Sequence, residues 1–129
     1  MVISAALRKE LGLLEESIKN AEDWLSRTPI AEGKRLLIKE FTGDRDDPFV
    51  YYMTVEADGA LWKSPIQVED KENADAYLCD TRRVSDLPIN ERAEYASRIP
   101  ELIRLIQEDE DGFPARIKDI RTEIDSVIC

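Results

Sequence analysis

Residues 34–68 constrain the fold most, because only there do the apolar residues follow a strand-like pattern. Residues 49–55, Phe-Val-Tyr-Tyr-Met-Thr-Val, are aromatic and β-branched types that suit a half-buried pleated surface. The Asp-Gly pair at 58–59 is a strong hairpin signal when such runs flank it. Residues 61–68 supply the return strand and residues 36–42 a further strand. The segment therefore predicts a three-stranded antiparallel meander.

Helical periodicity precedes this segment. Ser4 is the expected N-cap of a helix that runs to about Arg27, before Thr28 and Pro29. Its apolar residues recur at steps of four and three, which is a heptad seam suited to one partner helix. The residues of this seam are Leu7, Leu11, Leu14, Ile18, Ala21 and Leu25.

Several helices are expected after the sheet. One starts at Asn73 and ends near Arg83, and a second starts at Asn90 and breaks at Ile99, since the residue before a proline avoids helical geometry. A third runs from Pro100 to Gly112, its candidate C-cap, and Pro114 opens a fourth. The last helix carries a second narrow seam, at Phe113, Ile117, Ile120, Ile124 and Val127 or Ile128. The chain is therefore expected to be a single α+β domain, 1–129, and its two seams predict a homodimer or packing on each other.

Charge limits the class of partner. The net charge is −10, and residues 69–129 carry nine basic and sixteen acidic side chains, a net charge of −7. Direct nucleic-acid binding is disfavoured because phosphate contacts need clustered Lys and Arg, and a basic or amphiphilic protein partner is favoured. No apolar run is long enough to span a membrane, and no signal peptide is evident. Reduced Cys79 and Cys129 in the cytoplasm are therefore expected.

The residue types present exclude most catalytic chemistry. The chain has no histidine and two cysteines, so histidine-based triads and common zinc sites cannot be built. Residues 44–47, Asp-Arg-Asp-Asp, lack the glycine and trailing glutamate of a calcium loop, and we interpret them as a polar hairpin loop. We therefore expect no enzyme, no cofactor and no metal, with a histidine-free enzyme as a remote alternative.

Two groups of residues are candidate partner contacts. Glu108, Asp109, Glu110 and Asp111 place four like charges near the expected end of a helix, where the dipole disfavours them. Tyr51, Tyr52 and Trp62 place aromatic side chains on the predicted sheet, and such residues are common interface anchors. If helices leave one sheet face uncovered, that face is a second binding surface.

These observations favour a non-catalytic protein-binding module, a small acidic inhibitor or adaptor. Immunity proteins, antitoxins and phage anti-defence proteins share this size and acidity, although general properties alone carry that comparison. One alternative is a small anionic-ligand-binding protein, with a pocket between the sheet and the C-terminal helices and Arg82 or Arg83 gripping the anion. Another is a nucleic-acid mimic with phosphate-like rows of carboxylates at Glu91, Glu94, Glu101 and 108–111.

Overall fold

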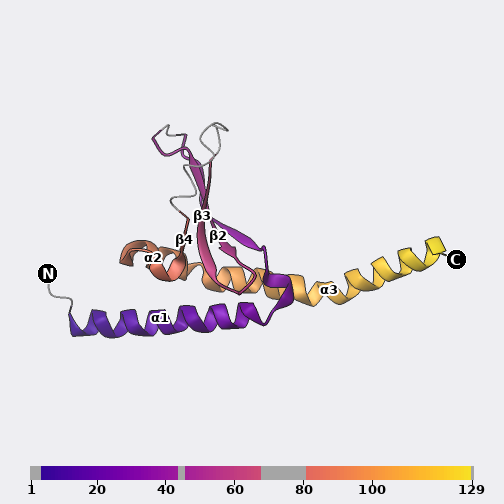
Figure 1. Ribbon diagram of the computed structural model, residues 1–129, viewed down its shortest axis with the longest axis horizontal. Coiled ribbons are helices and arrows are strands. Elements are labelled where there is room, and N and C mark those ends of the chain that lie inside the picture. The colour runs from indigo at the N-terminus through magenta and orange to yellow at the C-terminus, as the bar shows by residue number, and fades with distance from the viewer. Residues whose placement is uncertain (1–3, 44–45, 68–80, 129) are drawn as a thin grey trace.

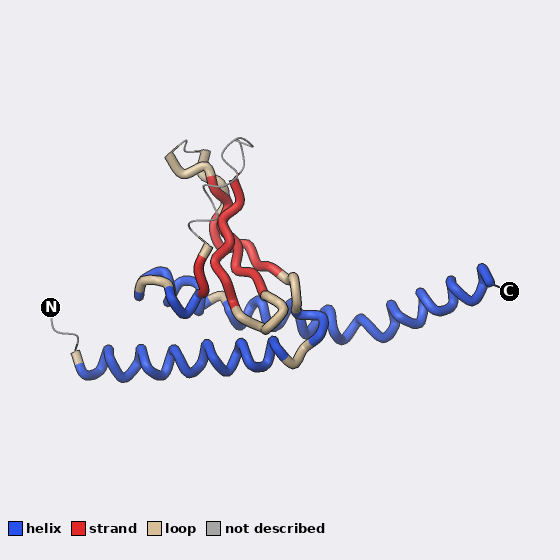
Figure 2. Tube along the Cα trace, viewed as in Figure 1, coloured by secondary structure: helices blue, strands red, loops and turns tan. Residues whose placement is uncertain are grey.

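The chain folds into a small antiparallel sheet flanked by helices, which confirms the predicted α+β class (Figures 1 and 2). A computed structural model describes residues 4–43, 46–67 and 81–128. None of the helices in these ranges is long and apolar enough to cross a membrane. The helices are α1 (Ala5–Ser26), the short 3₁₀ turns η1 (Pro29–Ala31) and η4 (Val84–Asp86), α2 (Ile89–Ser97) and α3 (Ile99–Ile128). The strands are β1 (Arg35–Lys39), β2 (Phe49–Val55), β3 (Leu61–Gln67) and β4 (Arg82–Arg83).

The sheet has the strand order β1-β2-β3-β4, and every neighbouring pair is antiparallel. The predicted meander is therefore present as β1 to β3, with a register that pairs Val55 with Leu61 across the hairpin. The fourth strand was not predicted. Arg82 and Arg83 pair with Lys63 and Trp62, so the prediction of a helix reaching Arg83 is wrong at that end. Two charged residues carry no strand pattern of their own, and the preceding part of that predicted helix lies outside the described residues.

The β2–β3 hairpin rests on α1. Gly59 has a positive φ of 84°, as the predicted Asp-Gly turn requires. The Asp58 side chain accepts a hydrogen bond from the backbone N–H of Ala60 at 3.0 Å. A Cβ atom on Gly59 would lie 2.5 Å from the backbone oxygen of Glu22 in α1. Glycine thus serves both the turn and the close approach of the hairpin to the helix.

The core lies between one sheet face and the helices. Strand alternation directs Met53 and Val55 to this face, with Leu61 opposite Val55 and Leu36 opposite Met53, and all four are buried. The helices, the 3₁₀ turns and Leu87, which lies between η4 and α2, contribute the remaining apolar residues of the cluster. The core comprises Ile18, Leu25, Ala31, Leu36, Met53, Val55, Leu61, Val84, Leu87, Tyr95, Ile99, Leu102 and Ile106.

Helix α1 has the predicted N-cap, since the Ser4 hydroxyl accepts a hydrogen bond from the N–H of Leu7 at 3.1 Å. The helix ends at Ser26, with Arg27 as its C-cap. Its seam is buried only in the second half, at Ile18 and Leu25, whereas Leu7 is 43% exposed. The two halves of this one seam therefore have different environments.

Helix α3 is continuous from Ile99 to Ile128 and contains Pro114. The prediction of two helices separated at Gly112 is therefore wrong. Gly112 is not among the glycines with positive φ, which the predicted C-cap geometry needs. Proline inside a helix removes one hydrogen bond and favours a kink, and the ribbon of α3 changes direction in its second half (Figure 1). The apolar heptad keeps one phase across the proline, as a single helix requires.

Candidate functional site

The second half of α3 is an exposed helical projection, which we call the arm (residues 113–128). It extends past the other elements toward the C-terminus (Figure 1). Its apolar residues are unusually accessible, with Ile117, Ile120 and Ile124 exposed by 42%, 47% and 51%. Val127 is 81% exposed. We define the arm seam as Phe113, Ile117, Ile120, Ile124 and Val127.

The arm seam continues the stripe by which α3 packs into the core. In the first half of the helix, Ile99 and Ile106 are buried at heptad positions and Ile103 is partly buried against the core. Glu110 occupies the next heptad position and is exposed. One apolar stripe thus begins in the core, is interrupted by one carboxylate and ends in solvent. Such exposed apolar surface is typical of a protein-binding site.

The acidic run 108–111 lies in the middle of α3, so the prediction that it sits beside a helix end is wrong. The dipole argument therefore does not apply to these residues, because that effect is confined to the terminal turns. Asp109 forms an ion pair and hydrogen bond with Lys34, and this contact lowers the pKa of the Asp109 carboxyl. Glu108 and Asp109 border an open groove of about 450 Å³ with Leu102 and Ile106. Glu110 lies on the heptad line instead, so the four carboxylates do not form one surface.

An acidic groove runs between α1 and the turn η4. It has a volume of about 620 Å³ and is lined by Gly12, Glu15, Glu16, Ile18, Lys19, Glu22, Arg83, Ser85 and Asp86. The groove lining thus contains four carboxylates and two cationic side chains, beside the apolar side chain of Ile18. A Cβ atom on Gly12 would meet nothing within 4 Å, so space above the helix is open at that point. The charge favours a basic ligand.

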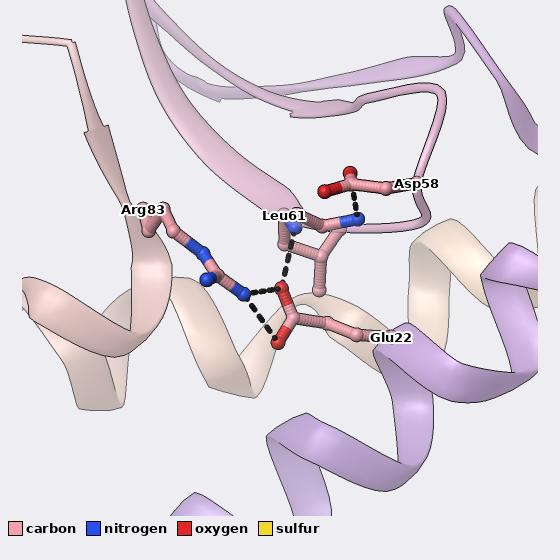
Figure 3. A network of polar contacts seen from close by, with 5 residues as sticks. Glu22, Asp58, Leu61 and Arg83 are labelled. Atoms are coloured by element: carbon pink, nitrogen blue, oxygen red, sulfur yellow. Dashed lines mark hydrogen bonds and ion pairs between the residues drawn. The ribbon is translucent and has the colours of Figure 1, made fainter.

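At one end of this groove, the Glu22 carboxylate bonds to residues of two strands (Figure 3). Its Oε2 accepts a hydrogen bond from the backbone N–H of Leu61 at 2.7 Å and one from Arg83 Nη2 at 3.3 Å. The carboxylate therefore joins α1 to β3 and β4. Sequence reasoning missed this contact, although a glutamate four residues after Ile18 on the buried stripe of α1 was a usable signal. A buried charge requires a partner.

The two arginines proposed to grip an anion are placed differently. Arg83 pairs with Glu22 at 3.3 Å, so its guanidinium is engaged within the chain. The cavity between the sheet and α2 has a volume of about 200 Å³ and is lined by Ile38, Lys39, Tyr51, Lys63, Glu91, Glu94 and Tyr95. Neither Arg82 nor Arg83 lines it. Lys63 is bound to Glu91 at 2.9 Å across this cavity.

The three aromatic candidates lie on two faces of the sheet. Tyr51 lines the cavity beside Tyr95, and its hydroxyl donates to Asp47 at 2.8 Å. Tyr52 lies on the opposite face, where Arg35 stacks on its ring at 4.5 Å. Trp62 shares that face by register, and it lines an open depression of about 520 Å³. The strand residues that share this face by register are all partly or fully exposed, namely Arg35, Leu37, Val50, Tyr52, Thr54, Trp62, Ser64, Ile66 and Arg83.

Several of the remaining candidate residues form ion pairs. Among the carboxylates of the proposed mimic, Glu91 pairs with Lys63, Glu101 with Arg98 and Asp109 with Lys34. In the candidate calcium loop, Asp44 and Arg45 lie outside the described residues, and Asp47 contacts Lys39 at 3.5 Å. Within the described ranges, no three acidic or cysteine side chains gather closely enough to hold a metal ion.

Comparison with known proteins gives no relative from which a function can be transferred. No family model, no curated protein and no solved structure matches the chain.

Proposed function

We propose that this protein is a non-catalytic protein-binding module of the cytoplasm, an acidic inhibitor or adaptor that also self-associates. The observation that carries this proposal is the arm seam. Five apolar side chains follow one stripe of a helix, and three of them are isoleucines exposed by 42–51%. Fully burying an isoleucine gains about 1.5–3 kcal/mol. A partner that covers this stripe therefore gains about half of that value for each of the half-exposed isoleucines.

The acidic groove supports a basic or amphiphilic partner. Glu15, Glu16 and Asp86 line it beside Ile18, so a segment with cationic and apolar side chains finds both kinds of contact. Glu22 is already bound by Leu61 and Arg83, and Glu15 is paired with Arg92 at 3.5 Å. Glu16 and Asp86 are therefore the lining carboxylates available to steer a cation. Electrostatic complementarity of this kind mainly raises the association rate and selects the partner.

The proposal is tested by capturing proteins from an extract of the organism that encodes the chain. The wild-type chain is expected to retain one basic protein in stoichiometric amount. Glu16→Lys/Asp86→Lys should lose it, because the variant reverses the charge of the groove. Asp119→Lys/Asp125→Lys is the matched control, since it changes the net charge equally at exposed positions off the arm seam.

The control variant should retain the protein as the wild type does. If the wild-type chain retains no stoichiometric protein, the partner-binding function is wrong. Equal retention by the groove variant would instead move the contact elsewhere, with the exposed Tyr52 and Trp62 face as the next surface to mutate.

A further inference from the structure

We propose that the arm binds the arm of a second copy as an antiparallel pair, with the two-fold axis between Ile117 and Ile120. This inference rests on the proposed self-association and adds its orientation and register. The apolar seam supplies the attraction but is compatible with several arrangements. The charged residues that flank the seam distinguish among them.

Three charged residues flank the arm seam. Arg116 and Glu123 each precede a seam residue, and Arg121 directly follows Ile120. In a heptad these are the positions beside the apolar core, where charges set the orientation of the partner. Arg116 stacks on Phe113 of its own chain at 5.9 Å. Within the described ranges, neither Arg116 nor Glu123 forms an ion pair.

A parallel pair is disfavoured by these charges. In parallel helices, the residue before one seam position faces the residue that follows the next seam position on the partner. Arg116 would then face Arg121 of the second copy, and symmetry would repeat the contact. Like charges placed in this way are destabilising.

An antiparallel pair brings opposite charges together. With the axis between Ile117 and Ile120, these two residues face each other across the interface, and Phe113 faces Ile124. Arg116 of each copy then faces Glu123 of the other, so the favourable contact occurs twice. Sliding the pair by one heptad would instead set Arg116 against Arg116, or Glu123 against Glu123. The charge pattern therefore selects one orientation and one register.

The position of the arm allows this arrangement. The arm extends away from the sheet and α2 (Figure 1), so two antiparallel arms place the folded parts of the two copies at opposite ends. Glu110 would face Val127 of the second copy at the outer edge of the interface, where water reaches the carboxylate. The helix is already formed in the free chain, so binding does not have to nucleate it.

The test is a comparison of dimer dissociation constants by sedimentation equilibrium at low salt. Wild type should dimerise at about tens to hundreds of micromolar, since the seam is short. Arg116→Glu should weaken the dimer by about tenfold or more, because it replaces two attractive contacts with two repulsive ones. Glu123→Arg should do the same, and the double variant Arg116→Glu/Glu123→Arg should recover the wild-type value.

Lys118→Glu is the matched control, since it makes the same charge change at an exposed position off the seam. It should leave dimerisation unchanged, and circular dichroism should show equal helix content in all variants. A tighter dimer in Arg116→Glu would overturn the antiparallel assignment, because only a parallel pair gains from removing that charge. A wild-type chain that stays monomeric at every concentration would overturn self-association as well, whereas the groove experiment would remain independent of both results.

Discussion

Gly59 is the residue at which the turn and the packing of the sheet coincide. A side chain there meets a positive φ and the backbone of α1 at 2.5 Å. We expect Gly59→Ala to lower the free energy of unfolding by about 2–4 kcal/mol, from backbone strain and overpacking together. Gly33 is the control, with a φ of 81° and nothing near its would-be Cβ. Gly33→Ala should lower the free energy of unfolding by only about 1 kcal/mol. Equal losses for the two variants in urea denaturation would show that the hairpin does not pack closely on α1 at Gly59.

Tyr95 gives the molecule an alkaline dependence of stability. Its side chain is buried, and burial together with Glu91 and Glu94 raises the pKa of its hydroxyl far above the ordinary value. The unfolded chain therefore releases this proton near pH 10, while the folded chain keeps it, so stability falls as the pH rises beyond about 10. Tyr95→Phe should lose less free energy of unfolding than the wild type between about pH 9 and pH 11, the range in which an ordinary tyrosine titrates. An identical pH slope in both proteins would contradict this assignment.

These residues also show which features of the structure could be predicted from the sequence. The Asp-Gly turn, the extent of β2 and the Ser4 cap depend on neighbouring residues, and the sequence predicted each of them. The contact of Gly59 with α1 and the bond from Glu22 to Leu61 join segments far apart in the chain. Such contacts depend on tertiary packing, which local patterns do not encode. The acidic groove was missed for the same reason, because its two walls come from α1 and η4.

Among the elements, α3 shows that a continuous apolar heptad can outweigh the boundary signals of a glycine and a proline. Gly112 and Pro114 indicated a boundary, yet the heptad that links Ile106 to Phe113 and Ile117 keeps the phase of one helix. A glycine costs about 1 kcal/mol inside a helix and a proline about 3 kcal/mol. The helix tolerates both residues, so its periodicity was the better guide. For the same reason the acidic run belongs to the middle of the helix.

The two halves of α3 should differ in local stability. The first half packs on the core through Leu102 and Ile106, whereas the described arm residues are exposed or only partly buried. We expect amides at 115–126 to exchange hydrogen far faster than those at 102–108 in a dilute sample. Raising the concentration should slow exchange in the arm alone, with the first turns of α1 as an internal control. Slow arm exchange at the lowest concentration would show that the arm is held within its own chain.

At the scale of the whole molecule, the surfaces separate into two regions. The acidic groove lies on α1 and η4, and the arm projects away from the sheet and α2 (Figure 1). If arms pair as proposed, the two Ile106 residues lie about 40 Å apart along the arm axis, given a rise of about 1.5 Å per residue. The dimer would then present two grooves at a fixed spacing. A partner with two basic segments would gain from binding both at once.

The continuity of α3 has a consequence for how its length can vary. With no loop between core and arm, each inserted residue would turn everything beyond it by about 100° about the helix axis. A seven-residue insertion after Asp111 would return the seam to nearly its original direction around the helix axis. Three inserted residues would instead leave it about 60° short of a full turn, and four would carry it about 40° beyond one. An eleven-residue insertion, about three turns, would preserve the direction equally well. The distance between the core and the arm seam can therefore change without reorienting the seam only by insertions that are close to whole turns of the helix.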